Sequence, residues 1–171
     1  MRIISRIVLT TLLIFAPLLA NAQDKLQQHV YHLFFRLQEL DGGGKIVNTR
    51  SFSTTLATGM GHDASIRSGT RVPVRTKDDK DGPAYTYIDV GVNIDARNAL
   101  EEESSLNLVV NAEASSLIAP VSSSSANPVI RQNRWSSSLG VPIGKPTIIF
   151  SSDNLEDKGK IQLEMTATPE K

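Results

Sequence analysis

Apolar and polar residues alternate along most of this chain. In the longest clear run, 85–96, every second residue falls on the same side of an extended backbone. The more apolar side consists of Thr86, Ile88, Val90, Val92, Ile94 and Ala96. A period of two is typical of a strand with one buried face. A second strand is predicted at 65–74, and turn-forming residues at 76–83 separate the two, so the sequence predicts a β-hairpin over 65–96.

Glycine and turn residues divide the rest of the chain in the same way. The runs 28–40 and 45–56 flank a glycine-rich turn at 41–44. They predict another hairpin, because glycine supplies the positive φ angles that such turns need. Further strands are predicted at 105–117, 128–141, 147–150 and 160–168.

Three segments lack this alternation. A short helical turn is predicted at 98–104, a flexible loop rich in Ser and Pro at 118–127, and a charged turn at 151–159. The whole pattern amounts to about seven to nine short strands with almost no helical period. It predicts an all-β fold, either an antiparallel sandwich or a partly closed barrel.

The first 22 residues have the features of an export signal. Arg2 and Arg6 precede an apolar run at 7–20, and Ala20-Asn21-Ala22 matches a cleavage site. The alternative is a retained anchor, but the apolar run is short of the roughly 20 residues that a membrane span needs. We therefore expect a signal peptide at 1–22, a single domain at 23–171, and export to the periplasm or outer membrane of a Gram-negative-type bacterium.

Charge and cysteine content narrow the function classes. Of the 18 basic side chains, Arg2 and Arg6 lie in the signal, so the processed chain has 16 against 18 acidic ones and a net charge of about −2. This balance argues against a nucleic-acid partner, which would require a basic patch. The chain has no cysteine, so it has no disulfide, no thiolate nucleophile and no cysteine-bound metal.

Several segments, in the same order along the chain, resemble the C-terminal β-domain of the bacterial secretin family. The most distinctive are ASIRSGTRVP at 64–73 and YIDVGV at 87–92. Weaker matches are LNLVVNAEAS at 106–115, GKPTII at 144–149 and the terminal strand IQLEMTATP at 161–169. The resemblance extends over about 30–168 and implies a reduced, stand-alone form of that domain.

Secretins form ring-shaped outer-membrane channels of type II and type III secretion and of type IV pili. The resemblance therefore implies a non-enzymatic envelope protein that acts in the assembly of a secretion or pilus-type complex. It also implies an outer-membrane association and partners that are copies of the chain or other secretion-system proteins. The alternative is a monomeric periplasmic β-sandwich that binds a protein or a glycan, with Lys160, Arg67, Arg71 and Arg50 blunting the strand edges.

Five residues are candidates for an interface. Arg131 and Trp135 share one face of a predicted strand, Arg134 lies beside them, and Arg and Trp are enriched at protein interfaces. The alternative places Trp135 in the sandwich core with arginine at its rim. Asp89 and Asn93 lie opposite an apolar stripe and would face solvent or a neighbouring subunit.

No catalytic, cofactor or metal site is expected. The acidic residues at 78–81 suggest a calcium loop, but the first and last positions of an EF-hand would hold Lys77 and Ile88, so a solvated turn is favoured. A third function class is a hydrolase that uses His62 with Asp63. The chain lacks the Gly-x-Ser-x-Gly motif, and an adjacent His-Asp pair has a poor geometry for a triad.

Overall fold

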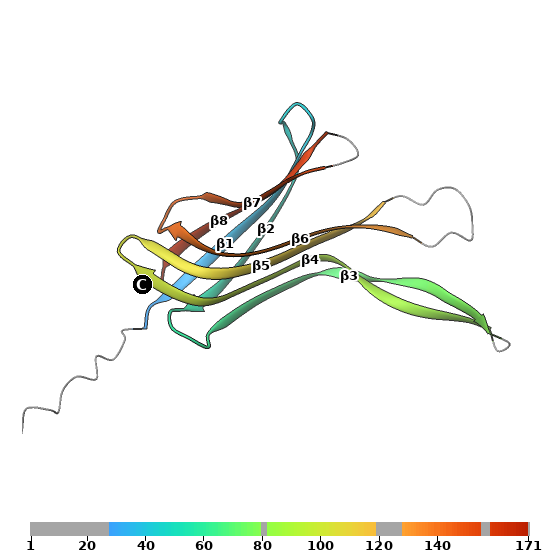
Figure 1. Ribbon diagram of the computed structural model, residues 1–171, viewed down its shortest axis with the longest axis horizontal. Helices are drawn as coiled ribbons and strands as arrows, with labels where there is room; N and C mark the ends of the chain where they lie inside the picture. The colour runs from blue at the N-terminus through green and yellow to red at the C-terminus, as the bar shows by residue number, and fades with distance from the viewer. Residues whose placement is uncertain (1–27, 80–81, 119–127, 155–157, 171) are drawn as a thin grey trace, which may run out of the picture.

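The computed structural model describes residues 28–79, 82–118, 128–154 and 158–170 (Figure 1). The predicted signal peptide and most of the predicted loop 118–127 lie outside these residues. The described part contains the strands β1 (Val30–Leu40), β2 (Ile46–Ala57), β3 (Asp63–Asp79), β4 (Gly82–Glu102), β5 (Ser105–Ile118), β6 (Val129–Pro142), β7 (Thr147–Asp153) and β8 (Lys160–Pro169). No helix long and apolar enough to cross a membrane occurs among the described residues.

These strands form two antiparallel sheets that pack face to face. The first sheet has the order β2-β1-β8-β7 and the second the order β3-β4-β5-β6. The predicted all-β sandwich is therefore confirmed, and neither sheet closes into a barrel. The two predicted hairpins are the pairs β1-β2 and β3-β4. The strands of the second hairpin are longer than expected, with 17 residues in β3 and 21 in β4.

The core lies between the two sheets. The middle strands β1, β8, β4 and β5 contribute alternate side chains to it, as the period of two predicts, whereas the edge strands contribute fewer. The largest fully buried side chains are Tyr31, Phe35, Leu33, Ile94, Leu106, Leu108, Leu163, Met165, Val110 and Val141. They come from the middle strands of both sheets and from the end of β6, so the apolar faces of the two sheets cover each other.

The first and last strands of the described chain are neighbours. β1 pairs with β8 in an antiparallel register that runs from Tyr31 opposite Pro169 to Leu40 opposite Lys160. The first sheet is therefore built from both ends of the sequence, whereas the second sheet is built from its middle.

The helical turn predicted at 98–104 is wrong, because β4 continues to Glu102. Arg97 pairs with Val109 and Leu100 with Asn107, so two residues of β4 lie opposite one of β5. This is a β-bulge: Asn98 adopts a φ of 55° and Ala99 is buried. Pairing with β5 along this segment overrides the helical tendency of its alanine, leucine and glutamates.

The two sheets pack closely at one end, here called the closed end, and diverge at the other, the open end (Figure 1). The second sheet also divides into two hairpins towards the open end. Pairing of β4 with β5 starts at Val92 opposite Ala114, whereas β3 and β4 stay paired out to their tip. We call residues 70–75 and 84–90 of β3 and β4 the distal ribbon.

Two glycines lie at the base of the distal ribbon. Gly69 of β3 and Gly91 of β4 are opposite each other in the register. A Cβ atom on Gly91 would lie 2.1 Å from the carbonyl oxygen of Ser68 and 2.4 Å from the Cα of Gly69. The two backbones therefore approach more closely here than any other residue type allows.

Candidate functional site

The five predicted interface residues lie at three places in the structure. Asn93 and Arg134 are on the outer face of the second sheet, on either side of Glu113 in the register. Arg131 and Trp135 face the first sheet. Asp89 is on the distal ribbon, where its carboxylate accepts a hydrogen bond from Arg71 Nε at 3.0 Å. The structure therefore groups four of them in two pairs on opposite faces of the second sheet, with Asp89 apart, and does not join all five into one site.

A row of polar side chains crosses the outer face of the second sheet. The register places Arg67, Asn93, Glu113 and Arg134 side by side, one from each strand. Arg134 donates to Glu113 Oε2 at 2.8 and 3.1 Å, and Gln132 donates to its other oxygen at 2.7 Å. The Arg134 side chain is 71% exposed, so this pair contributes at most about 1 kcal/mol to folding.

Asp95 is the other anionic centre on this face. Burial alone would raise the pKa of its carboxyl, but hydrogen bonds from Ser65 and Arg67 outweigh burial and lower that pKa. Ser65 Oγ donates at 2.6 Å, and Arg67 Nη2 donates to both carboxylate oxygens at 2.7 and 3.0 Å. Asp95 is therefore ionised at neutral pH and holds Arg67 over β4.

Trp135 lies half-buried between the sheets. Its ring stacks on Phe150 of β7 with the centroids 5.7 Å apart and the planes 10° from parallel. Together they close one lateral side of the core, between the edge strands β6 and β7. The sequence indicated the face on which Trp135 lies, but it gave no sign of Phe150 as its partner.

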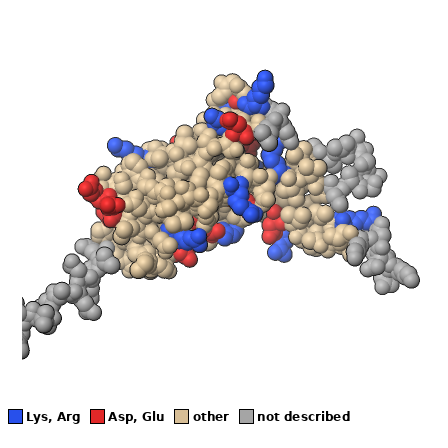
Figure 2. All heavy atoms as spheres, in the orientation of Figure 1, with Lys and Arg blue, Asp and Glu red and all other residues tan. Residues whose placement is uncertain are grey.

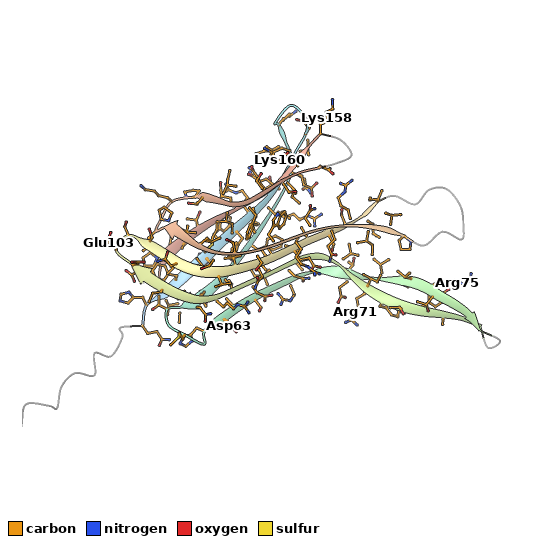
Figure 3. The ribbon with its side chains drawn as sticks, in the orientation of Figure 1. Asp63, Arg71, Arg75, Glu103, Lys158 and Lys160 are labelled. Atoms are coloured by element: carbon orange, nitrogen blue, oxygen red, sulfur yellow. The ribbon has the colours of Figure 1, made fainter. Side chains whose placement is uncertain are left out.

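A cleft opens between the sheets at the open end. Its volume is about 420 Å³, and Leu37, Val92 and Ile161 form its apolar base. Leu40 and Val47 also belong to the lining, together with charged and amide side chains: Glu39, Asp41, Asn48, Arg50, Arg131, Asn133, Asn154 and Lys160. Figure 3 shows Lys160 near the end of β8 where the sheets have separated. The space between the sheets thus changes from apolar at the closed end to polar at the open end.

Charge of one sign does not accumulate on the visible surface. Figure 2 shows Lys and Arg close to Asp and Glu, with uncharged side chains between the groups. Among the described residues, no cluster of three or more His, Asp or Glu is placed to hold a metal ion.

A histidine–glutamate–tyrosine group at the closed end was not predicted. His29 Nδ1 lies 2.5 Å from Glu101 Oε2. The hydrogen bonds from His29 and then Tyr31 lower the pKa of Glu101. Burial, followed by the hydrogen bond and charge of Glu101, raises the pKa of Tyr31 to about 12. Sequence reasoning missed the group because residue 101 was expected on a helical turn, 72 positions from His29.

His62, considered as a general base, lies in the loop between β2 and β3. Its Nε2 is 2.6 Å from Gln28 Nε2, so its contact is with a side-chain amide. The serine hydroxyls with hydrogen bonds in the structure bond elsewhere, for example Ser65 to Asp95 and Ser115 to Gly91. The geometry at His62 does not resemble a catalytic triad.

The fold is shared with secretins. Over 84% of this chain, the structure superimposes on the secretin InvG of the Salmonella SPI-1 type III injectisome with a TM-score of 0.53 and 11% identity, and covers 64% of that chain. A type II secretin, GspD of enteropathogenic Escherichia coli, gives 0.50 and 10% over the same 84%, and 69% of that chain is covered. No family model and no curated protein sequence matches the chain.

A third match is to the Klebsiella pneumoniae type II secretion system outer-membrane complex of PulD, PulS and the PulC HR domain. The TM-score is 0.50 at 11% identity, and the match covers 84% of this chain but 39% of the other. The resemblance seen in the sequence is thus confirmed for the fold. The chain spans about two-thirds or less of the length of these secretin chains.

Proposed function

We propose that this chain is an exported, non-enzymatic envelope protein whose copies join edge to edge in a ring-shaped assembly of the secretion or pilus type. The observation that carries the proposal is the pair of four-stranded sheets, each ending on both sides in a strand that no other described strand covers. An uncovered strand presents a row of backbone donors and acceptors that another chain can pair with. The secretin fold supports the same conclusion.

The strand directions favour lateral growth. Each sheet has four antiparallel strands, so its two edge strands run in opposite directions. β6 of one copy can therefore pair antiparallel with β3 of the next, and β7 can pair with β2 in the same way. Such a head-to-tail contact uses two different surfaces, and it closes into a ring when the rotation between copies allows.

The edge of β6 can be blocked without disturbing β5. Pro142 pairs with Ser105 and has no N–H, so its nitrogen must point away from β5. Backbone groups alternate along a strand, so the even-numbered residues of β6 direct theirs to the open edge. Ser138→Pro would therefore remove an edge donor and leave the β5 ladder intact, and Ser138→Ala is the matched control.

The test is the mass of the processed chain, 23–171, measured by light scattering after size exclusion with and without detergent. The proposal requires a discrete oligomer that persists in Ser138→Ala and is lost in Ser138→Pro. A chain that stays monomeric under all conditions contradicts edge-to-edge assembly. An oligomer that is unchanged by Ser138→Pro contradicts the role of the β6 edge.

The second candidate function is a monomeric periplasmic binding module. It is favoured by the polar-lined cleft of about 420 Å³ at the open end, a size typical of ligand sites. A stable monomer that retains a protein or glycan from envelope extracts, and loses it in Arg50→Ala, would support this alternative.

A further inference from the structure

The β4 edge of the distal ribbon is not paired with any described strand. A hydrogen-bonded serine marks the point where its pairing with β5 ends. Pairing of β4 with β5 ends at Val92. One step further, the Ser115 hydroxyl accepts a hydrogen bond from the Gly91 N–H at 2.9 Å and donates to the Gly91 carbonyl at 3.3 Å. A side chain thus takes the place of the next backbone pair and ends the ladder.

The register shows which backbone groups face this gap. Gly91 directs its N–H and C=O towards β5, where the Ser115 hydroxyl forms hydrogen bonds with both groups. The pairing of β3 with β4 continues without a shift from Gly91 to Tyr85, so alternate residues of β4 keep the same orientation. Asp89, Tyr87 and Tyr85 therefore direct their backbone groups to the side that β5 has left.

Pro73 supports this orientation independently. It lies opposite Tyr87, and it has no N–H to give to β4. The Pro73–Tyr87 pair must therefore be one in which both residues point their backbone groups outward, Tyr87 into the gap and Pro73 to the free edge of β3. The two edges of the ribbon consequently differ: the β3 edge lacks a donor at Pro73, whereas 84–90 of β4 contains no proline.

We propose that the β4 edge of the distal ribbon, at Tyr85, Tyr87 and Asp89, binds an extended segment of a partner protein as an added antiparallel strand. This mode of recognition uses main-chain hydrogen bonds for affinity and alternate side chains for specificity. Nothing in the proposal requires the ring proposed above.

The side chains of the ribbon define the partner segment. One face carries Ile88, 39% exposed, with Val72 and Val74 beside it, so alternate residues of the segment should be aliphatic. The other face carries Tyr85 and Tyr87, 54% and 64% exposed, and Asp89. The Asp89 carboxylate is already paired with Arg71 on the same face, so it is the two exposed phenol rings that favour lysine or arginine at the residues between, by cation–π contact.

A second copy of the chain is a less suitable occupant. The distal part of its β3 has Pro73 at the centre of the edge it would offer. The edge of β6 is the one that lateral assembly would use.

The test measures hydrogen–deuterium exchange of the whole processed chain at residue resolution. The probe is an acetylated, amidated peptide of about nine alternating lysine and valine residues. Without peptide, the amides of Tyr85, Tyr87 and Asp89 should exchange fast, while those of Thr86 and Ile88, which face β3, are protected. With peptide, the three fast amides should slow by about tenfold or more.

A pair of proline variants gives the control. Tyr87→Pro removes a donor from the β4 edge and should weaken peptide binding by about tenfold. Arg71→Pro removes a donor from the β3 edge and should bind the peptide as tightly as Arg71→Ala, which loses the same ion pair with Asp89. If Tyr87→Pro does not fold, a peptide N-methylated at alternate residues replaces it, and it should not protect the three amides.

Three results would overturn the proposal. The first is slow exchange of the three amides without peptide. The second is peptide binding that does not protect these amides. The third is binding of the peptide to Tyr87→Pro that is as tight as its binding to the unmodified chain. Protection that rises with protein concentration in the absence of peptide would instead assign the edge to a second copy.

Discussion

Replacing Gly91 by alanine should destabilise the domain by about 2–6 kcal/mol. The new Cβ would lie 2.1 Å from the Ser68 carbonyl oxygen and 2.4 Å from the Gly69 Cα, and both are backbone atoms that cannot rotate away. Gly91 also has a φ of +156°, a conformation that side-chain-bearing residues rarely adopt. Backbone strain of this kind amounts to about 1–3 kcal/mol, and overpacking adds about 1–3 kcal/mol more.

The assay is urea and thermal unfolding followed by circular dichroism. For a domain of this size, about 1 kcal/mol shifts Tm by about 2–4 °C, so Gly91→Ala should lower Tm by about 4–24 °C. Gly144→Ala is the matched control, because Gly144 has a φ of +75° but no atom within 4 Å of an added Cβ. It should cost about 1–2 kcal/mol from conformation alone.

The difference in stability between the two variants measures the cost of the contact between the added Cβ at residue 91 and the backbone of β3. If Gly91→Ala is no less stable than Gly144→Ala, the strands can separate at the base of the distal ribbon at little cost. The close approach of the two glycines would then not fix the position of the ribbon.

Two further predictions concern the core and the closed end. Phe35→Ala should lower the free energy of unfolding by about 3–5 kcal/mol, because Phe35 is fully buried. Its neighbour Phe34 is half-buried on the outer face, so Phe34→Ala should lower the free energy of unfolding clearly less. Equal decreases for the two variants in urea unfolding would contradict the assignment of the two side chains to opposite faces. The pKa of Tyr31, raised from 10.0 to about 12, means that folding favours its protonated form. This stabilisation is complete below pH 10 and is lost as the pH rises through 12. The unfolding midpoint should therefore fall less steeply between these pH values in Tyr31→Phe than in the unmodified chain. The same pH dependence in both proteins would refute the role of Tyr31.

Alternation predicted the strands best in the middle of each sheet, where β1, β8, β4 and β5 have one buried face. Leu33 and Phe35 point inward and Phe34 outward, as a period of two requires. Turn residues placed the connection of β1 and β2 at 41–44 correctly. The turn predicted at 76–83 is wrong for most of its length, because β3 continues to Asp79 and β4 starts at Gly82, and the two strands stay paired through these turn-forming residues. The prediction at 98–104 failed because the segment has helix-forming residues, and only its pairing with β5 makes it a strand.

Contacts between distant residues could not be predicted. The sequence showed neither that β1 pairs with β8 nor that Trp135 stacks on Phe150, because pairing partners depend on topology rather than local pattern. The group of His29, Tyr31 and Glu101 depends on the same long-range arrangement. The open edge at Tyr87 needed the register of β3 with β4, which no residue pattern fixes.

The pairing of β1 with β8 determines when the protein can fold. A chain that emerges from its N-terminus, from a ribosome or a translocation channel, has β1 and β2 long before β8. Until 160–169 arrives, one edge of β1 and one side of the core remain exposed to water. A chaperone that protects β1 during this interval should therefore raise the yield of folded protein.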